Sequence, residues 1–132
     1  MENKQKTILV VEDERPLLEA IKIKLEKTGF AVVTTRTVEQ TMDYLKEIGT
    51  VDAVWLDHYL LGKENGLDFV TKLKAHDGEW SKIPIFVVSN TASADKVQAY
   101  IRFGINKYYT KSDHKLEEIV SDIKSFLENP KE

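Results

Sequence analysis

Residues 8–14 read ILVVEDE, so four apolar residues run directly into three acidic ones. A short uninterrupted run of Val, Ile and Leu is typical of a β-strand that is covered on both faces. Four further short runs follow, at 31–35, 53–56, 85–88 and 108–110. We therefore expect five strands, of which the second is the weakest because threonines dilute its apolar character.

Apolar side chains between and after these runs recur at helical spacing, which predicts five helices packed on the sheet. The expected core stripes are Leu17, Leu18, Ile21 and Leu25; Val38, Met42 and Leu45; Leu67, Phe69, Val70 and Leu73; Ala94, Val97, Tyr100 and Ile101; and Leu116, Ile119, Val120, Ile123 and Leu127. We expect Gly29 and Gly104 to end the first and fourth helices. Ser93 is a candidate cap of the fourth helix, and Pro130 is expected to end the fifth. Regular alternation of strand and helix predicts an α/β fold with a parallel sheet wound on both sides.

The composition fits one domain. The chain has 132 residues, 42% of them hydrophobic and 31% charged, and we expect one domain over 1–132 with a core at about 6–128. The lack of cysteine excludes disulfides and cysteine-based zinc sites. A net charge of −3 without a basic stripe argues against a nucleic-acid partner. The first apolar run is too short for a signal peptide or a membrane span, so we expect a cytoplasmic location.

Acidic residues follow the first and third predicted strands. Glu12 and Asp13 come after one, and Asp57 after the other, while Ser89 and Lys111 follow the fourth and fifth. The carboxyl ends of parallel strands lie at one edge, where sites form in such sheets. Two carboxylates about 4 Å apart repel by roughly 4 kcal/mol at an effective dielectric near 20, so we expect cations here.

Oxygen ligands without cysteine or paired histidines favour Mg²⁺, with Mn²⁺ as the other candidate. A hard dication, a lysine and a hydroxyl around one carboxylate suit phosphoryl transfer, in which charge on the phosphoryl oxygens is neutralised. Asp57 is the natural nucleophile of such a site, because aspartyl phosphates are a known type of covalent intermediate.

Four segments together resemble the receiver domains of response regulators in two-component signalling, of the chemotaxis-regulator-like single-domain type. They are ILVVEDE at 8–14, AVWLDHYL at 53–60, IPIFVVSN at 83–90 and GINKYYTKS at 104–112. They occur in the family's order and span nearly the whole chain. The resemblance implies a flavodoxin-like, doubly wound sheet of five parallel strands in the order 2-1-3-4-5 with five helices, an arrangement for which this family is itself a standard illustration.

The resemblance also implies a metal site and a phosphoacceptor. Asp57 would accept the phosphoryl group and contact the metal. Asp13 would bind the metal directly and Glu12 through water, with the backbone carbonyl of Tyr59 as a further ligand.

Other roles implied by the resemblance concern the bound phosphoryl group. Lys111 would form an ion pair with it and Ser89 a hydrogen bond, while Tyr108 would turn inward as Ser89 moves. A structural role, as a buried hydroxyl or a core aromatic, stays open for Ser89 and Tyr108. The expected neighbours of the pocket are His58, Asn90 and Thr91.

In this family a histidine kinase or a histidine phosphotransfer protein donates the phosphoryl group. The receiver is no conventional enzyme, since it catalyses only its own phosphorylation and dephosphorylation. The resemblance implies that the downstream protein binds the face made by the fourth helix, fifth strand and fifth helix, here 94–103, 108–110 and 113–127. Because the chain ends soon after the fifth helix, we expect no attached output domain.

Two departures from the family pattern leave a second function open. Ser112 stands where a proline usually follows the lysine, which favours a trans bond, and Asn90 stands where the family has a small residue. Both features are compatible with a constitutive interaction module that keeps the fold but is never phosphorylated. A flavodoxin is disfavoured because the loop after the first strand is acidic, and a phosphohydrolase would need a cap domain for which the chain has no length.

Overall fold

A five-stranded parallel sheet forms the centre of the molecule, in a computed structural model that describes residues 5–76, 78–90 and 93–128. The strand order is β2-β1-β3-β4-β5, which confirms the predicted fold class. The strands are β1 Thr7–Val11, β2 Ala31–Thr35, β3 Ala53–Leu56, β4 Ile85–Ser89 and β5 Lys107–Thr110. Three boundaries differ by one residue from the predicted runs, because an apolar run does not mark where backbone pairing starts or ends.

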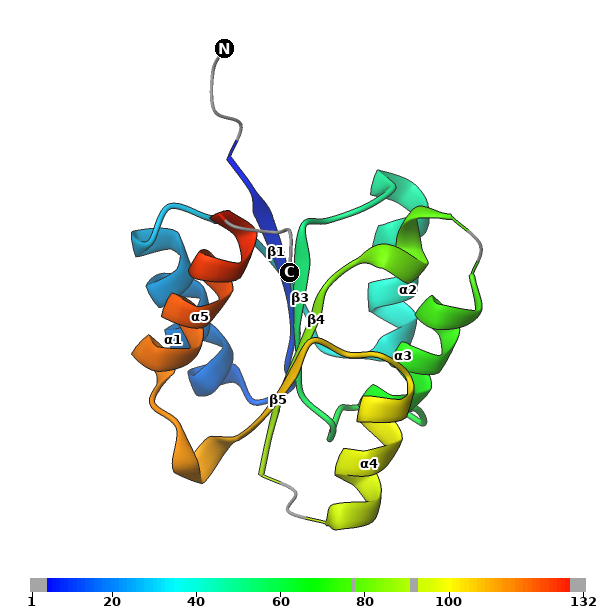
Figure 1. Cartoon of the computed structure of the whole chain (residues 1–132). Coiled ribbons are helices and arrows are strands. Elements are labelled where there is room, and N and C mark those ends of the chain that lie inside the picture. Colours follow the sequence, from blue (N-terminus) through cyan, green and yellow to red (C-terminus); the bar gives the residue numbers. More distant parts are fainter. Residues whose placement is uncertain (1–4, 77, 91–92, 129–132) are drawn as a thin grey trace.

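Two layers of helices enclose the sheet, with α1 and α5 on one face and α2, α3 and α4 on the other (Figure 1). The helices are α1 Arg15–Lys27, α2 Val38–Ile48, α3 Gly66–Ala75, α4 Ala94–Arg102 and α5 Leu116–Glu128. Two short 3₁₀ helices, η1 Glu79–Lys82 and η2 Lys111–Asp113, precede β4 and α5. Helices in the described part of the chain are all too short or too polar to cross a membrane.

Each face of the sheet has its own core, because successive side chains of a strand point to opposite faces. Trp55 and Tyr109 belong to the cluster under α1 and α5, while Leu56 and Tyr100 belong to the cluster under α2, α3 and α4. The indole N–H of Trp55 is buried and has no hydrogen-bond partner among the described residues. β1, β3 and β4 are buried on both sides almost throughout, which explains their uninterrupted apolar sequences.

Helix α4 corrects one prediction about the core. Ala94 is exposed and Ile101 is 54% exposed, whereas Tyr100 is completely buried. Helical periodicity identifies which residues share a face but does not fix how the helix is rotated against the sheet. The rotation is set by the Tyr100 ring, which fills the space beside Tyr108 at 5.8 Å between ring centroids.

The predicted helix ends on α1 and α4 are confirmed. Gly29 and Gly104 follow these helices with φ of 108° and 86°, a backbone conformation that favours glycine. The Ser93 side chain accepts a hydrogen bond from the backbone N–H of Lys96, as expected of a cap. Pro130 lies outside the described residues.

Helix α3 begins with a capping box. The Asn65 side chain accepts the backbone N–H of Asp68 at 3.0 Å, and the Asp68 carboxylate accepts the backbone N–H of Asn65 at 2.8 Å. Two otherwise unpaired donors at the helix start are thereby satisfied. This anchors the end of the loop that follows β3.

We predict that Asn65→Ala lowers the free energy of unfolding by about 1 kcal/mol, because it removes the side-chain half of this box. Urea unfolding at fixed pH measures the effect. Thr50→Ala, at an exposed position outside a helix, serves as the control and should change stability by less than about 0.5 kcal/mol. Equal stability of Asn65→Ala and the wild type would contradict the assigned role of the box.

Candidate functional site

Three carboxylates meet at the carboxyl ends of β1 and β3. The last paired residues of these strands, Val11 and Leu56, are register partners, so Glu12 and Asp57 leave neighbouring strands side by side. One ligand atom each from Glu12, Asp13 and Asp57 lies within 4.8 Å of the other two. The structure thus brings together the three acidic residues that the sequence predicts at this edge of the sheet.

Lys111 reaches this cluster from the end of β5. Its Nζ lies 3.3 Å from Oε1 of Glu12 and 3.6 Å from Oδ2 of Asp57. Both carboxylates are almost fully buried, at 1% and 4% residue exposure. Two buried carboxyl groups therefore share one ammonium group, which cannot neutralise the cluster when all three acids are ionised.

Burial is the largest cause of the raised pKa of the Glu12 and Asp57 carboxyl groups. It raises the pKa of Glu12 from 4.5 to about 7, with further upward pressure from the charge on Asp57 and opposing attraction from Lys111. Burial also raises the pKa of Asp57, against the attraction of Lys111 and a hydrogen bond from Ser89. Desolvation of the charged form outweighs its pairing here, and carboxyl groups perturbed in this way cluster at functional sites.

The donor set fits a hard divalent metal ion. It offers carboxylate oxygens from three side chains, of which Glu12 and Asp57 are buried and Asp13 is half-buried. Mg²⁺ is commonly bound by one or two carboxylates and keeps several waters, so this cluster can supply its protein ligands. The acidic cluster can therefore bind a metal.

Two donors hold the Asp57 carboxylate in place. The backbone N–H of His58 donates to Oδ1 at 2.8 Å, while Ser89 hydrogen-bonds the same side chain from the end of β4. Ser89 is completely buried, and its register partner across the sheet is Thr110, next to Lys111. The fourth and fifth strands thus bring a hydroxyl and an ammonium group to the acids on the first and third.

Arg36 is a contributor to the site that no motif in the sequence singles out. It follows the end of β2, and its guanidinium donates twice to the backbone carbonyl of Asp13, from Nε at 3.2 Å and Nη2 at 2.8 Å. The only signal in the sequence is that Arg36 comes directly after a predicted strand. This double contact orients the loop that carries Asp13.

His58 is a buried neighbour of the site. Its Nδ1 lies 2.6 Å from the hydroxyl of Tyr100 on α4. Burial lowers the pKa of the His58 imidazole, and the positive charge of Lys96 lowers it further. The ring is thus neutral at neutral pH and holds one hydrogen bond to Tyr100.

The remaining predicted residues lie around the edge of the site. Tyr108 is half-buried, and burial raises its pKa while a hydrogen bond with Ser89 lowers it. Tyr59 is 52% exposed, and its hydroxyl accepts a hydrogen bond from Nζ of Lys96 at 3.2 Å, so only its backbone remains a candidate metal ligand. Asn90 is exposed, and Thr91 lies outside the described residues.

The loop after β5 has the trans geometry expected for a lysine that no proline follows. The peptide bond between Lys111 and Ser112 is trans, and both residues belong to η2. This turn directs the Lys111 side chain back over the sheet while Ser112 stays exposed.

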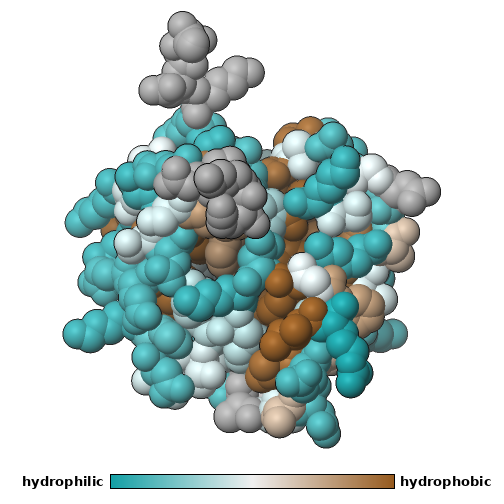
Figure 2. Space-filling model, in the orientation of Figure 1, coloured by the Kyte–Doolittle hydropathy of each residue, from teal (hydrophilic) through white to brown (hydrophobic). Residues whose placement is uncertain are grey.

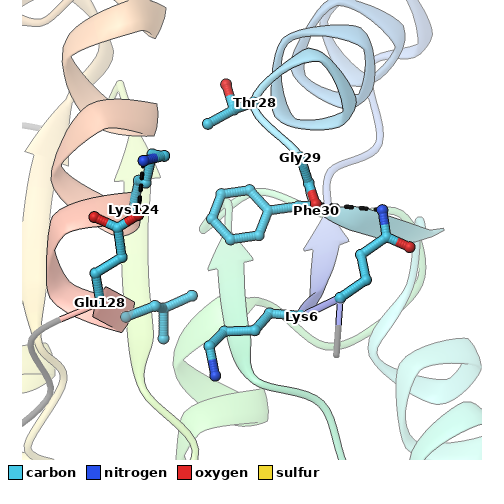
Figure 3. Close-up of a pocket in the computed structure, with 8 residues that line it drawn as sticks. Lys6, Thr28, Gly29, Phe30, Lys124 and Glu128 are labelled. Carbon is cyan, nitrogen blue, oxygen red and sulfur yellow. Dashed lines mark hydrogen bonds and ion pairs between the residues drawn. The ribbon is translucent and has the colours of Figure 1, made fainter. Parts of the chain in front are cut away.

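A second hollow lies far from these residues, at the amino ends of the strands (Figure 3). It encloses about 420 Å³ between the start of β1, the end of α1 and the end of α5. Lys124 and Glu128 on its wall pair with each other at 2.7 Å, and Phe30 forms its apolar side. Because it shares no residue with the acidic cluster, we assign it no part in the chemistry.

Comparison with known proteins identifies relatives over almost the whole chain. The family model described as the response regulator receiver domain matches residues 8–124. The transcriptional regulatory protein YvrH of Bacillus subtilis is 31% identical over 113 residues, which cover 84% of this chain and 45% of that protein. KdpE of Mycobacterium tuberculosis is 34% identical, covering 79% of this chain and 43% of that protein. The chain thus spans about half the length of such relatives.

Solved structures match over nearly their full length. The phosphorylated cyanobacterial phytochrome response regulator RcpA superposes with a TM-score of 0.85 at 26% identity, covering 98% of each chain. The Mn²⁺-bound form of the response regulator Rcp1 gives a TM-score of 0.81 at 26% identity, covering 94% of this chain and 96% of that one.

The raised pKa of Glu12 predicts a pH dependence of stability. The folded protein holds this proton more tightly than the unfolded chain does. The protonated Glu12 side chain therefore contributes fully to the free energy of unfolding below about pH 4.5. This contribution is lost as the pH rises through about 7. In Glu12→Gln, which resembles the protonated side chain, this loss should disappear.

Urea unfolding of the metal-free protein between about pH 5 and 8 tests this prediction. The wild type should lose more stability across this range than Glu12→Gln. Glu19→Gln, at an exposed position on α1, should follow the wild type. Parallel profiles for the wild type and Glu12→Gln would show that the Glu12 carboxyl group does not titrate as described.

Proposed function

Because this chain belongs to the response regulator receiver domain family of two-component signalling, we propose that it accepts a phosphoryl group on Asp57 with the help of a bound divalent cation. A receiver domain is not a conventional enzyme, and its family implies a histidine kinase as partner. The observation that supports Asp57 most strongly is its position. Its carboxylate contacts Lys111, Ser89 and the backbone N–H of His58 together.

The proposed reaction moves a phosphoryl group from a histidine of the kinase, or of a phosphotransfer protein, to Asp57. One Asp57 oxygen attacks phosphorus, the phosphorus–nitrogen bond breaks, and the leaving imidazole takes up a proton. Lys111 lies where it can pair with the transferred oxygens, and Ser89 can donate a hydrogen bond to them. Charge neutralisation and positioning carry the catalysis, because the protein has little covalent chemistry to supply.

The metal in this proposal is Mg²⁺, with Mn²⁺ as the other candidate, held by Asp13, Asp57 and, through water, Glu12. The backbone carbonyl of Tyr59 completes the proposed ligands. When bound, the dication offsets the repulsion within the acidic cluster and neutralises charge on the phosphoryl oxygens. The solved Mn²⁺-bound form of Rcp1 and the phosphorylated form of RcpA, at 26% identity each, support both parts of the proposal.

The proposed output surface is formed by α4, β5 and α5. Ile101 is 54% exposed and Phe103 39% exposed, both at the carboxyl-terminal end of α4. Figure 2 shows apolar surface, in brown, in the region where α4 and β5 meet. Exposed apolar side chains that border charged ones are common where another protein binds. Tyr108, half-buried beneath this surface, is the proposed switch residue together with Ser89.

The extent of the domain and its location are part of the same proposal. We treat about 6–128 as one receiver unit, because the strands and helices of the described residues form one sheet with two covering layers. Transfer from a histidine kinase and the cysteine-free composition fit the cytoplasm.

A constitutive interaction module of the same fold is the second candidate. Ser112 in place of the usual proline favours it, together with Asn90 beside the pocket. The two functions differ in one measurable property, which is whether Asp57 becomes phosphorylated.

We predict that incubation with Mg²⁺ and a small acyl-phosphate donor adds one phosphoryl group to the protein, observed as a mass increase of the intact chain. Asp57→Asn should abolish the increase, because the amide is a far poorer nucleophile. Asp43→Asn, an exposed aspartate on α2, should label as the wild type does. Labelling that persists in Asp57→Asn would refute the acceptor assignment, and an unlabelled wild type would favour the constitutive module.

A further inference from the structure

A buried hydrogen bond joins the loop after β3 to helix α4. Nδ1 of His58 lies 2.6 Å from the hydroxyl of Tyr100, and the two rings meet edge to face with centroids 5.7 Å apart. Tyr100 is completely buried and His58 is 3% exposed. A short polar contact without access to water is strong, and breaking it leaves a buried group unpaired.

The same His58 residue holds the Asp57 carboxylate. Its backbone N–H donates to Oδ1 of Asp57 at 2.8 Å, while its backbone carbonyl accepts the N–H of Gly66 at 2.8 Å. The ring is fixed by Tyr100 and the peptide group by Asp57 and Gly66. A displacement of the peptide therefore moves the ring, and a displacement of the ring moves the donor to Asp57.

Gly66 leaves no free space around this contact. A Cβ at this position would lie 2.6 Å from the Tyr100 hydroxyl and 2.7 Å from the backbone carbonyl of Asp57. The start of α3 thus closes over the hydrogen bond. Packing this tight transmits a shift instead of absorbing it.

We propose that Tyr100 is a positioning residue that acts through His58 on Asp57, and that this hydrogen bond carries the phosphorylation state of Asp57 directly to helix α4. The inference rests on the proposed role of Asp57 as phosphoacceptor. Once an Asp57 oxygen carries the phosphoryl group as an acyl phosphate, the His58 N–H faces a different acceptor, and the linked ring and Tyr100 hydroxyl respond.

This route differs from the one through Ser89 and Tyr108. It runs from His58, on the loop after β3, to the buried Tyr100 side chain of α4. Ser89 and Tyr108, by contrast, lie on β4 and β5. The two routes meet at Tyr100, whose ring contacts that of Tyr108. The buried face of α4 is therefore in contact with both sides of the phosphorylation site.

The test compares hydrogen–deuterium exchange of α4 in the full chain before and after phosphorylation by an acyl phosphate with Mg²⁺. Tyr100→Phe removes only the hydroxyl group. Tyr109→Phe is a matched control, because Tyr109 is equally buried and its hydroxyl donates to Asp122 at 2.7 Å on the other face of the sheet. Phosphoryl incorporation is measured in each sample by mass.

In Tyr100→Phe the phosphorylation-dependent change in α4 exchange should fall about twofold or more, while Asp57 still becomes labelled. Tyr109→Phe should keep the full change. A full change in α4 of labelled Tyr100→Phe would overturn the inference and leave the acceptor role intact. An unlabelled wild type would remove the proposed function, and this inference would fall with it.

The double variant His58→Phe with Tyr100→Phe separates coupling from stability. Tyr100→Phe alone leaves the buried His58 ring without its partner and should lower the free energy of unfolding. With both polar groups replaced, this buried contact leaves no donor or acceptor unpaired, so the free energy of unfolding should return toward the wild-type value. The response of α4 should nevertheless stay reduced, since the hydrogen bond is still missing. Recovery of the α4 response along with stability would show that the pair is only structural and would contradict the proposal.

Discussion

The structure depends on one electrostatic constraint, which is the convergence of Glu12, Asp13 and Asp57 at a single edge of the sheet. Parallel pairing of β1 with β3 forces the first and last of these side by side, whatever their charges. Lys111 offsets part of the repulsion, yet burial still raises the pKa of both Glu12 and Asp57. Carboxyl groups held this way can bind a cation, because an opposite charge between them favours their charged forms.

The rest of the fold positions that edge. The α2, α3 and α4 layer covers one face of the sheet and the α1 and α5 layer the other, and the carboxyl ends of the strands lie between these two layers (Figure 1). Arg36 fixes the loop of Asp13, and the capping box at Asn65 fixes the end of the loop that starts at Asp57. Helix α4 lies against this second loop through Tyr100. Short contacts through His58 and Tyr100 therefore join Asp57 to α4, as the proposed phosphorylation switch requires.

Much of this arrangement could be predicted from the sequence, because strand ends determine it. An uninterrupted apolar run predicts a buried strand, and the polar residue that ends it then falls at the site, as for Asp57, Ser89 and Lys111. Contacts that depend on helix rotation could not be predicted. The stripe of α4 contains both Ile101 and Tyr100, and periodicity alone cannot say which one is buried. Arg36 and the His58–Tyr100 pair likewise depend on packing between segments distant in the sequence.

The most direct measurement of the central constraint is thermal unfolding as a function of Mg²⁺ concentration. A ligand that binds only the folded protein stabilises it by RT ln(1 + [L]/Kd), so the Tm of the wild type should rise steadily with Mg²⁺. Asp13→Asn removes one carboxylate from the cluster and should shift this rise to Mg²⁺ concentrations about tenfold higher or more. A wild-type Tm that does not respond to Mg²⁺, or an equal response in Asp13→Asn, would contradict the account.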